Sequence, residues 1–334
     1  MPSAAACADT APRAPTGRPS AFLCRRFTPG VEAVLRERFT LTTNEDDGIL
    51  TPSQIMARAR DAEVLFVTAT ESLRADTLAQ LPRLRIIATL SVGHDHIDLA
   101  AARAAGIAVL HTPDVLSDAC AEIAMMLLLN ACRRGLEGDR LVRSDAWQGW
   151  APTQLLGIGL PGRVLGIFGM GRIGRAIAHR ARAFGLRIAY HNRSRLEPSL
   201  EEGASYHDTL EGLLGASDLF MVAAPGAPAL RGVLDARRLA LLPPGAVLVN
   251  ISRGDLVDDE ALIAALRSGR LRAAGLDVFA NEPRVHPGYR TLDNVFLTPH
   301  IGSATEETRE AMGYMLIEGI EALGRNETPL NRLC

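Results

Sequence analysis

The chain has 334 residues, with 36 basic and 38 acidic side chains and a formal net charge of −2. A chain of this length usually folds into more than one domain, and a near-neutral charge argues against nucleic-acid binding. Every basic residue is an arginine. The absence of lysine excludes a lysine Schiff base and a P-loop lysine, and with them pyridoxal-phosphate chemistry and Walker-type ATP hydrolysis.

The five cysteines are scattered, and no two of them form a C-x-x-C pair. This pattern indicates reduced thiols in a cytoplasmic protein rather than a disulfide framework. We expect no metal site, because the histidines lack metal-ligand spacing, and no membrane span, because every apolar run is too short. Residues 1–20 are rich in Ala and Pro and lack an apolar core segment, which predicts a disordered tail rather than a secretory signal.

From residue 21 onward, apolar or β-branched runs alternate with stretches of helical composition. This alternation predicts βαβ units and parallel sheets covered on both faces. In the first half we expect strands at 21–24, 64–68, 85–91 and 109–111, and helices at 31–38, 52–60, 74–81, 99–105 and 117–134. The last helix is strongly apolar at 124–129, which indicates that another domain or a second subunit covers it.

A second series follows an exposed loop at 149–162. We expect strands at 163–168, 187–191, 218–223, 246–251, 273–278 and 295–298, and helices at 173–184, 209–214, 258–267 and 305–323. The predicted fold class is therefore α/β, with two doubly wound parallel-sheet domains. In such folds ligands bind beyond the carboxyl ends of the strands.

A glycine-rich segment, Gly169-Met170-Gly171-Arg172-Ile173-Gly174, fits the pattern G-x-G-x-x-G. The pattern alone is weak, but here it follows a predicted strand and opens a predicted helix, as a dinucleotide site requires. The first glycine allows a tight turn, the second lets a pyrophosphate approach the backbone, and the third permits close packing of helix and strand. We expect a Rossmann dinucleotide site here.

The end of the next strand predicts which dinucleotide is preferred. An NAD enzyme places Asp or Glu there to bind the ribose 2′-hydroxyl, whereas this chain has Asn192-Arg193-Ser194-Arg195, with no carboxylate before Glu197. Two guanidiniums and a hydroxyl suit a 2′-phosphate. A solvated basic turn would have the same composition. We expect NADP(H) to be preferred, with NAD(H) as the alternative cofactor.

Three chemically suggestive side chains follow successive strands of the second series: Arg253, Glu282 and His300. Singly, each has an ordinary explanation, namely a surface ion-pair partner, a turn residue before a proline, and a helix-entry histidine. Together, at the strand ends where the nicotinamide of a bound dinucleotide would lie, they predict a catalytic group.

The segments around these residues resemble the D-isomer-specific 2-hydroxyacid dehydrogenase family. The resemblance runs from about residue 21 to residue 323 and rests on Asn-x-Ser-Arg-Gly, Gly-x-Asp-Val-x-x-x-Glu-Pro and Pro-His-Ile-Gly. Within the family, the chain most resembles NADPH-dependent glyoxylate/hydroxypyruvate reductases, through Trp147-Gln148-Gly149-Trp150-Ala151-Pro152 and the turn at 191–195.

The resemblance implies a role for each candidate. Arg253 would pair with the substrate carboxylate and polarise the carbonyl oxygen. His300 would be the general acid in reduction, and Glu282 would orient its ring and favour its charged form. The N–H groups of Val92 and Gly93 would bind the substrate carboxylate. Further cofactor contacts are implied for Ala224, Pro225, Ile251, Asp277 and Gly302.

Two positions depart from the family pattern. His94 follows Val92 and Gly93 where an apolar or aromatic residue is common, and it either touches substrate or caps the next helix. The segment Ala223-Ala224-Pro225 replaces the more usual Cys-Pro or His-Pro, which weakens a polar contact to the cofactor.

The resemblance also predicts the domain organisation. A discontinuous substrate domain of flavodoxin-like type would comprise 21–110 and 305–334, and the Rossmann coenzyme domain 111–304. A homodimer is expected through segment 117–150, with Trp150 reaching the partner's active site; local packing of this tryptophan is the alternative.

We therefore expect an NADP-dependent reductase of glyoxylate, hydroxypyruvate or a similar small 2-keto acid. Two other functions stay open. One is an NAD-dependent D-2-hydroxyacid dehydrogenase of the phosphoglycerate or lactate type, and the other is a dinucleotide-sensing corepressor on the same fold. Neither a nucleic acid nor a membrane is expected as a partner.

Overall fold

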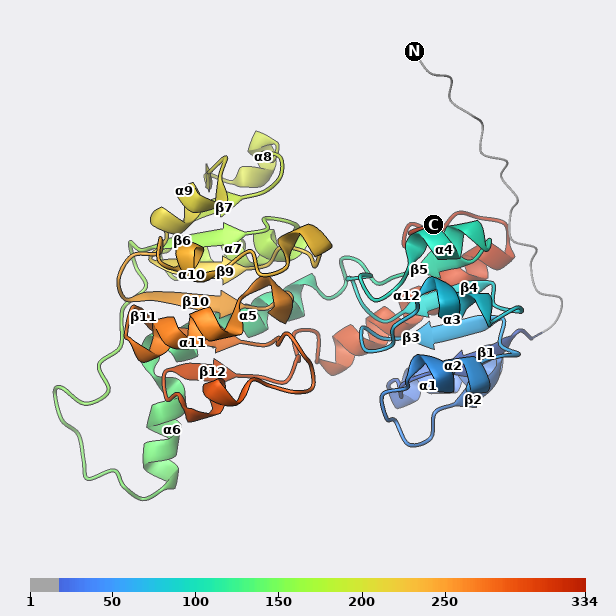
Figure 1. Cartoon of the computed structure of the whole chain (residues 1–334), viewed down its shortest axis with the longest axis horizontal. Helices are drawn as coiled ribbons and strands as arrows, with labels where there is room; N and C mark the ends of the chain where they lie inside the picture. Colours follow the sequence, from blue (N-terminus) through green and yellow to red (C-terminus); the bar gives the residue numbers. More distant parts are fainter. Residues whose placement is uncertain (1–17) are drawn as a thin grey trace, which may run out of the picture. The chain divides into compact units, whose positions relative to one another are not determined.

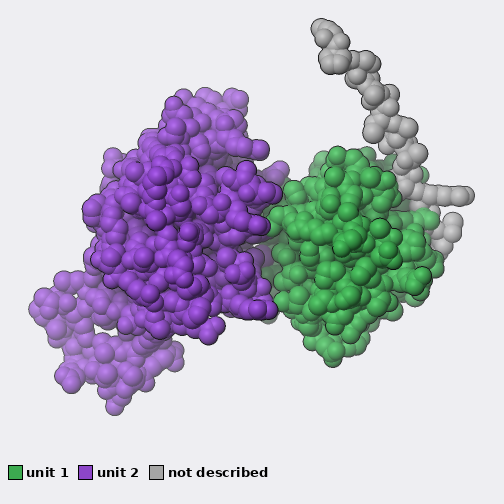
Figure 2. Space-filling model, viewed as in Figure 1, with its two compact units in different colours: residues 1–116, 305–334 green, residues 117–304 purple. Residues whose placement is uncertain are grey.

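The computed structural model describes residues 18–334, which divide into two compact units, each built around a parallel sheet (Figures 1 and 2). Unit 1 holds the described residues up to Leu116 together with Thr305–Cys334, and unit 2 holds Ser117–Ala304. The predicted fold class is confirmed.

Unit 1 contains a five-stranded sheet in the order β2-β1-β3-β4-β5, which is the order of flavodoxin-like folds. Its strands are β1 (Ser20–Leu23), β2 (Thr40–Thr43), β3 (Val64–Val67), β4 (Ile86–Thr89) and β5 (Ala108–Leu110). Its helices are α1 (Pro29–Arg38), α2 (Pro52–Arg58), α3 (Ala75–Ala79), α4 (Leu99–Ala104) and α12 (Glu306–Gly324). Strands β3 and β4 are buried along their whole length, as expected for strands covered on both faces.

Unit 2 contains a seven-stranded sheet in the order β12-β11-β10-β9-β6-β7-β8. Its strands are β6 (Val164–Phe168), β7 (Arg187–His191), β8 (Ser205–Tyr206), β9 (Leu219–Val222), β10 (Ala246–Asn250), β11 (Leu271–Leu276) and β12 (Val295–Leu297). Its α-helices are α5 (Ser117–Arg133), α6 (Gly135–Arg143), α7 (Arg172–Ala183), α8 (Pro198–Glu201), α9 (Leu210–Gly215), α10 (Ala236–Leu239) and α11 (Asp259–Arg267). The order reverses between β6 and β9, so a ligand crevice is expected beyond the carboxyl end of β6.

The inner face of the apolar helix α5 is covered within its own unit, which corrects the expectation of another domain, whereas a second subunit over its outer face stays a prediction. Its inner face joins a buried cluster with α7 and the sheet, and includes Leu127 and Leu128, both fully buried. Gly275 of β11 lies so close to α5 that an added Cβ would come within 2.8 Å of Cβ of Leu127. The sheet therefore accounts for most of the apolar sequence.

The segment after α5 was not anticipated as a helix. Helix α6 buries none of its residues, and the chain from 144 to 157 is almost wholly exposed or half-buried. In Figure 1, α6 and the loop after it extend away from the body of unit 2. We call residues 135–157 the arm.

Other differences from the predictions concern short elements and boundaries. The sequence missed β2, β8, α8 and α10, which have two to four residues each. The unit boundary follows Leu116 rather than residue 110, because the backbone N–H groups of His111 and Thr112 bond to Asn331 and Ser91 of unit 1.

The predicted tail at 1–20 lies largely outside the described residues, but its end is ordered. Ser20 begins β1, and Arg18 donates to the carbonyl of Phe39. Among the helices of residues 18–334, none has the length and apolarity needed to cross a membrane.

Candidate active site

The glycine segment lies at the carboxyl end of β6, where the strand order of unit 2 reverses, and leads directly into α7. Gly169 has φ +100°, and a Cβ there would come within 2.4 Å of the backbone of Ala224. A Cβ on Gly174 would come within 2.4 Å of the carbonyl oxygen of Gly169. A Cβ on Gly171 would meet nothing within 4 Å. The first and third glycines are thus needed for packing, whereas the second faces open space beside a helix N-terminus, the setting in which a pyrophosphate binds.

Asn192, at the end of β7, holds the glycine segment in place. Its side-chain oxygen accepts a hydrogen bond of 2.7 Å from the backbone N–H of Met170, whose side chain is buried. The sequence assigned Asn192 only to the cofactor. The structure adds a positioning role, which the spacing of 22 residues between donor and acceptor concealed.

Arg195 forms an ion pair with Glu201, a residue that the sequence analysis did not place near this turn. Its Nε and Nη2 donate to the two oxygens of Glu201, at 2.7 and 3.0 Å, and the guanidinium holds the pKa of Glu201 down to about 2. Tyr190 also donates to Glu201, at 2.6 Å. Two of the five N–H groups of Arg195 thus bind Glu201, and three remain for a ligand, so its contact with a 2′-phosphate stays a prediction. Arg193 and Ser194 are exposed on the same turn.

Arg253 follows β10, and a buried asparagine fixes its backbone. Asn250 accepts from the N–H of Ser252 and donates to the carbonyl of Arg253, at 3.0 and 2.9 Å. A Cβ on Gly254 would overlap the backbone between Phe279 and Ala280, so the chain after β10 lies directly against the chain after β11. Asn250 and Gly254 were not singled out from the sequence, although both belong to the Asn-x-Ser-Arg-Gly motif.

Asp277, just after β11, is buried and organises the histidine loop. Its carboxylate accepts from the Thr298 hydroxyl at 2.6 Å and from the N–H groups of Ile301 and Gly302 at 2.9 and 2.8 Å. Burial raises the pKa of Asp277, against the lowering effect of these hydrogen bonds and of nearby His300. The carboxylate therefore supports the loop that carries His300, a role additional to the expected cofactor contact.

His300 and Glu282 form a hydrogen-bonded pair at the same edge of the sheet. His300 Nδ1 lies 2.7 Å from Glu282 Oε2, and the other oxygen of Glu282 accepts from the N–H of Phe279 at 2.9 Å. Burial alone would raise the pKa of Glu282, but the hydrogen bond and charge of His300, together with Phe279 and Arg253, lower it. The ionised Glu282 requires a proton on Nδ1, so Nε2 is the nitrogen left for substrate.

The other predicted cofactor residues lie at the same edge of unit 2. Ala224 is buried against Gly169, and its carbonyl accepts from the Ser252 hydroxyl. Ile251 follows β10, and Gly302 follows the histidine. In contrast, Trp150 lies on the arm and is 82% exposed.

Val92 and Gly93 follow β4 of unit 1. Among the described residues, neither of their backbone N–H groups donates a hydrogen bond. Backbone N–H groups of consecutive residues that have no partner in the protein are available to bind an anion. His94, the next residue, is exposed, and its ring lies 6.5 Å from that of His111 in an edge-to-face arrangement.

The donor set of unit 2 fits a bound dinucleotide. Backbone N–H groups at the start of α7 suit the pyrophosphate, and the strand ends carrying Ala224, Ile251 and Asp277 line the edge where a nicotinamide would lie. No cluster of His, Cys, Asp and Glu within residues 18–334 is arranged to hold a metal ion.

Comparisons with known proteins agree with this geometry. The model of the family "D-isomer specific 2-hydroxyacid dehydrogenase, NAD binding domain" matches residues 125–302. A curated glycerate dehydrogenase from Hyphomicrobium methylovorum is 42% identical over 86% of this chain and 90% of its own length. A solved structure from Polaromonas sp. JS6 66, named for the same family, is 68% identical with a TM-score of 0.91, covering 95% of this chain and 100% of its own.

A third similar protein carries bound ligands. The structure of an NADPH-dependent glyoxylate/hydroxypyruvate reductase from Sinorhizobium meliloti, in complex with NADP and malonate, is 36% identical. Its TM-score is 0.86, and the match covers 95% of this chain and 97% of that one. The chain thus belongs to the D-isomer-specific 2-hydroxyacid dehydrogenase family and is an oxidoreductase of 2-hydroxy acids.

Proposed function

We propose that the protein reduces glyoxylate, hydroxypyruvate or a similar small 2-keto acid to the D-2-hydroxy acid, with NADPH as the preferred reductant. The observation that carries this proposal is the pair of His300 and Glu282, held 2.7 Å apart at the edge of the sheet that also bears Arg253 and the glycine segment. The names of the similar reductases support the substrate class.

Each candidate residue then has a defined task. A nicotinamide bound at this edge would supply the hydride that reduces the keto carbon. His300 donates the proton from Nε2 to the carbonyl oxygen, and Glu282 stabilises the protonated ring through Nδ1. Arg253 binds the substrate carboxylate and polarises the carbonyl. The N–H groups of Val92 and Gly93 are further donors for a substrate carboxylate.

The preference for NADPH rests on the turn after β7. Arg193 and Ser194 are exposed there, and Arg193 makes no ion pair or hydrogen bond among the described residues. A guanidinium with its donors available can bind a 2′-phosphate in a bidentate manner, whereas a carboxylate at this place would repel it. The bound NADP of the similar Sinorhizobium meliloti enzyme supports the same assignment.

A second candidate is an NADH-linked enzyme of the glycerate dehydrogenase type. The ion pair between Arg195 and Glu201 favours it, because the carboxylate of Glu201 offsets the charge of one of the two cations offered to a 2′-phosphate. Steady-state rates with NADPH and NADH against glyoxylate, hydroxypyruvate, pyruvate and longer 2-keto acids distinguish the two. The proposal predicts a higher kcat/KM with NADPH and with the smaller acids; a preference for NADH would favour the second candidate.

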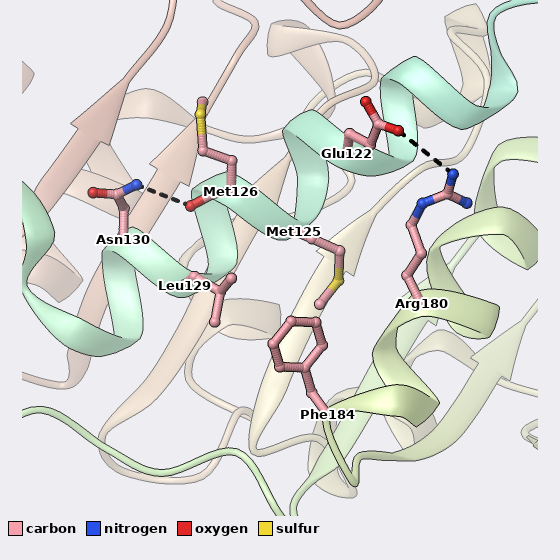
Figure 3. A pocket seen from close by; sticks show the side chains of 7 residues that line it. All are labelled: Glu122, Met125, Met126, Leu129, Asn130, Arg180 and Phe184. Atoms are coloured by element: carbon pink, nitrogen blue, oxygen red, sulfur yellow. Dashed lines mark hydrogen bonds and ion pairs between the residues drawn. The ribbon is translucent and has the colours of Figure 1, made fainter.

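We also propose a homodimer built through α5 and the arm. The arm exposes large apolar side chains that a monomer would leave in water, among them Val142, Trp147, Trp150 and Leu156. Between α5 and α7 lies an apolar groove with a cavity volume of about 400 Å³. Figure 3 shows Met125 and Phe184 facing one another across it, beside the ion pair of Glu122 and Arg180. A second copy would cover these surfaces, and Trp150 would then reach that copy's active site.

A further inference from the structure

The loop Ser91–Gly93, which we call the carboxylate loop, has all three of its carbonyl groups tied back into unit 1. The carbonyl of Ser91 accepts from the N–H of Thr112 at 3.0 Å. That of Val92 faces Nδ1 of His111 at 3.1 Å, and that of Gly93 accepts from the hydroxyl of Ser91 at 2.6 Å. Each carbonyl shares its peptide plane with the N–H of the next residue, so the bonds to the Ser91 and Val92 carbonyls fix the N–H groups of Val92 and Gly93. The bond from the Ser91 hydroxyl to the Gly93 carbonyl closes a ring that contains both N–H groups and so restricts the backbone rotations of Val92 and Gly93.

The hydrogen bond to Gly93 ends a chain of hydrogen bonds through His96, Thr89 and Ser91, which we call the relay. Every donor in this chain points toward the loop. The Gly93 carbonyl can only accept, so the Ser91 hydroxyl donates its single proton there. The contact of 2.9 Å between Ser91 Oγ and Thr89 Oγ1 must then be donated by Thr89, and the contact of 3.0 Å from Thr89 to His96 must be donated by Nε2 of His96. Thr89 is fully buried and His96 is 7% exposed. The relay thus runs from the core of unit 1 to the loop.

His111 fixes the middle peptide of the loop. Because the Val92 carbonyl is an acceptor, Nδ1 of His111 carries the proton, and this holds for the neutral tautomer as well as for the charged ring. The backbone of His111 is itself held by Asn331, near the C-terminus, in both directions. The C-terminal segment therefore supports the loop through His111.

We propose that Ser91 and His111 are positioning residues for substrate: His111 fixes the peptide that carries the N–H of Gly93, and the relay His96–Thr89–Ser91 keeps the loop closed in the conformation that presents the N–H groups of Val92 and Gly93 to the carboxylate of a 2-keto acid. This rests on the proposed function, because it assigns the loop to that carboxylate. Neither side chain touches the reacting atoms. Both act through the geometry of the loop, in which two charge-assisted N–H bonds need their donors pointing at one ion.

The test compares Ser91→Ala with a matched control, Ser20→Ala. Ser20 also donates its hydroxyl to a backbone carbonyl of unit 1, that of Asp61 at 2.8 Å, but it lies at the amino end of β1, whereas Ser91 follows the carboxyl end of β4. We expect Ser91→Ala to raise KM for glyoxylate and the Kd for oxamate about fivefold to twentyfold, with KM for NADPH changed less than twofold. Ser20→Ala should leave all three constants unchanged, and Ser91→Thr, which keeps the hydroxyl, should restore oxamate binding.

Oxamate binding is measured by calorimetry with NADP⁺ present, so the result does not depend on turnover. Unchanged KM and Kd in Ser91→Ala would overturn the inference, and so would an equal loss of NADPH binding, because that would mark a general structural defect. A wild-type protein that binds oxamate but reduces no 2-keto acid would overturn the proposed function and leave the positioning role measurable. A wild-type holoenzyme that binds no oxamate would overturn the inference as well.

Discussion

His300 occupies a strained backbone conformation that the surrounding residues must stabilise. Its φ is +54°, a region that costs a residue with a Cβ roughly 1–2 kcal/mol. Asp277 offsets this cost by accepting from the two residues that follow, Ile301 and Gly302, while its backbone carbonyl accepts from His300 itself. Strain of this kind is often found where a side chain must be aimed at a ligand.

Replacing the histidine tests its catalytic role. We predict that His300→Ala lowers kcat for reduction roughly 10²–10⁴-fold, because the general acid is lost. The Kd for NADPH, measured by fluorescence titration, should change little, because the glycine segment and α7 are untouched. Turnover near that of the wild type would remove His300 from its proposed role.

The carboxylate of Glu282 predicts a dependence of stability on pH. Its pKa is lowered on balance in the folded protein, so its ionised form favours folding above the ordinary pKa of glutamate, and this contribution is lost as pH falls through the lowered value. We predict that Glu282→Gln lowers Tm at pH 7, and that the difference from wild type narrows as pH falls below the ordinary glutamate pKa of about 4.3. A difference in Tm that stayed constant down to pH 3 would contradict this.

At the scale of elements, the three glycines after β6 have different roles: the first and third are required for packing, and the second for ligand binding. A Cβ on Gly174 would clash with the carbonyl of Gly169, whereas a Cβ on Gly171 meets open space. We predict that Gly174→Ala lowers Tm by several degrees, while Gly171→Ala leaves Tm unchanged and weakens NADPH binding at least tenfold. Thermal unfolding and a fluorescence titration measure the two effects. A Gly171→Ala variant with normal affinity for NADPH would show that no pyrophosphate approaches this position.

Elements with a strong local pattern were predictable from the sequence. Helix α7 follows a G-x-G-x-x-G segment, and β7 was expected at the residues where it lies. Strand β2 could not be found, because it is four residues long, sits at the sheet edge and alternates exposed with half-buried positions. Helix α6 was missed because it buries none of its residues.

The residues of the candidate site likewise divide into those that a sequence motif predicts and those whose contacts depend on the fold. Arg253, Glu282 and His300 could be found because each follows a strand within a specific motif. The contact of Arg195 with Glu201 could not, because it depends on where the chain after β7 turns. The positioning roles of Asn192 and Ser91 depend on hydrogen bonds to backbone groups, which leave no signal in residue type.

At the scale of the whole molecule, the exposed arm predicts the oligomeric state. We predict that Val142→Asp shifts the protein from dimer to monomer, because it places a charge in the surface that a second copy covers. Leu330→Asp is the matched control, because Leu330 is fully exposed in unit 1, outside the arm. Size-exclusion chromatography with light scattering measures the mass. A wild-type monomer would rule out the dimer.

Hydride transfer from the nicotinamide to a 2-keto acid can be followed directly with an isotope. Hydroxypyruvate is incubated with NADPH carrying deuterium at the transferred position of C4, and the product is analysed by mass spectrometry and on a chiral column. We predict D-glycerate with one deuterium at C2. Unlabelled glycerate, the L-isomer, or no product with any small 2-keto acid would contradict the proposed reaction.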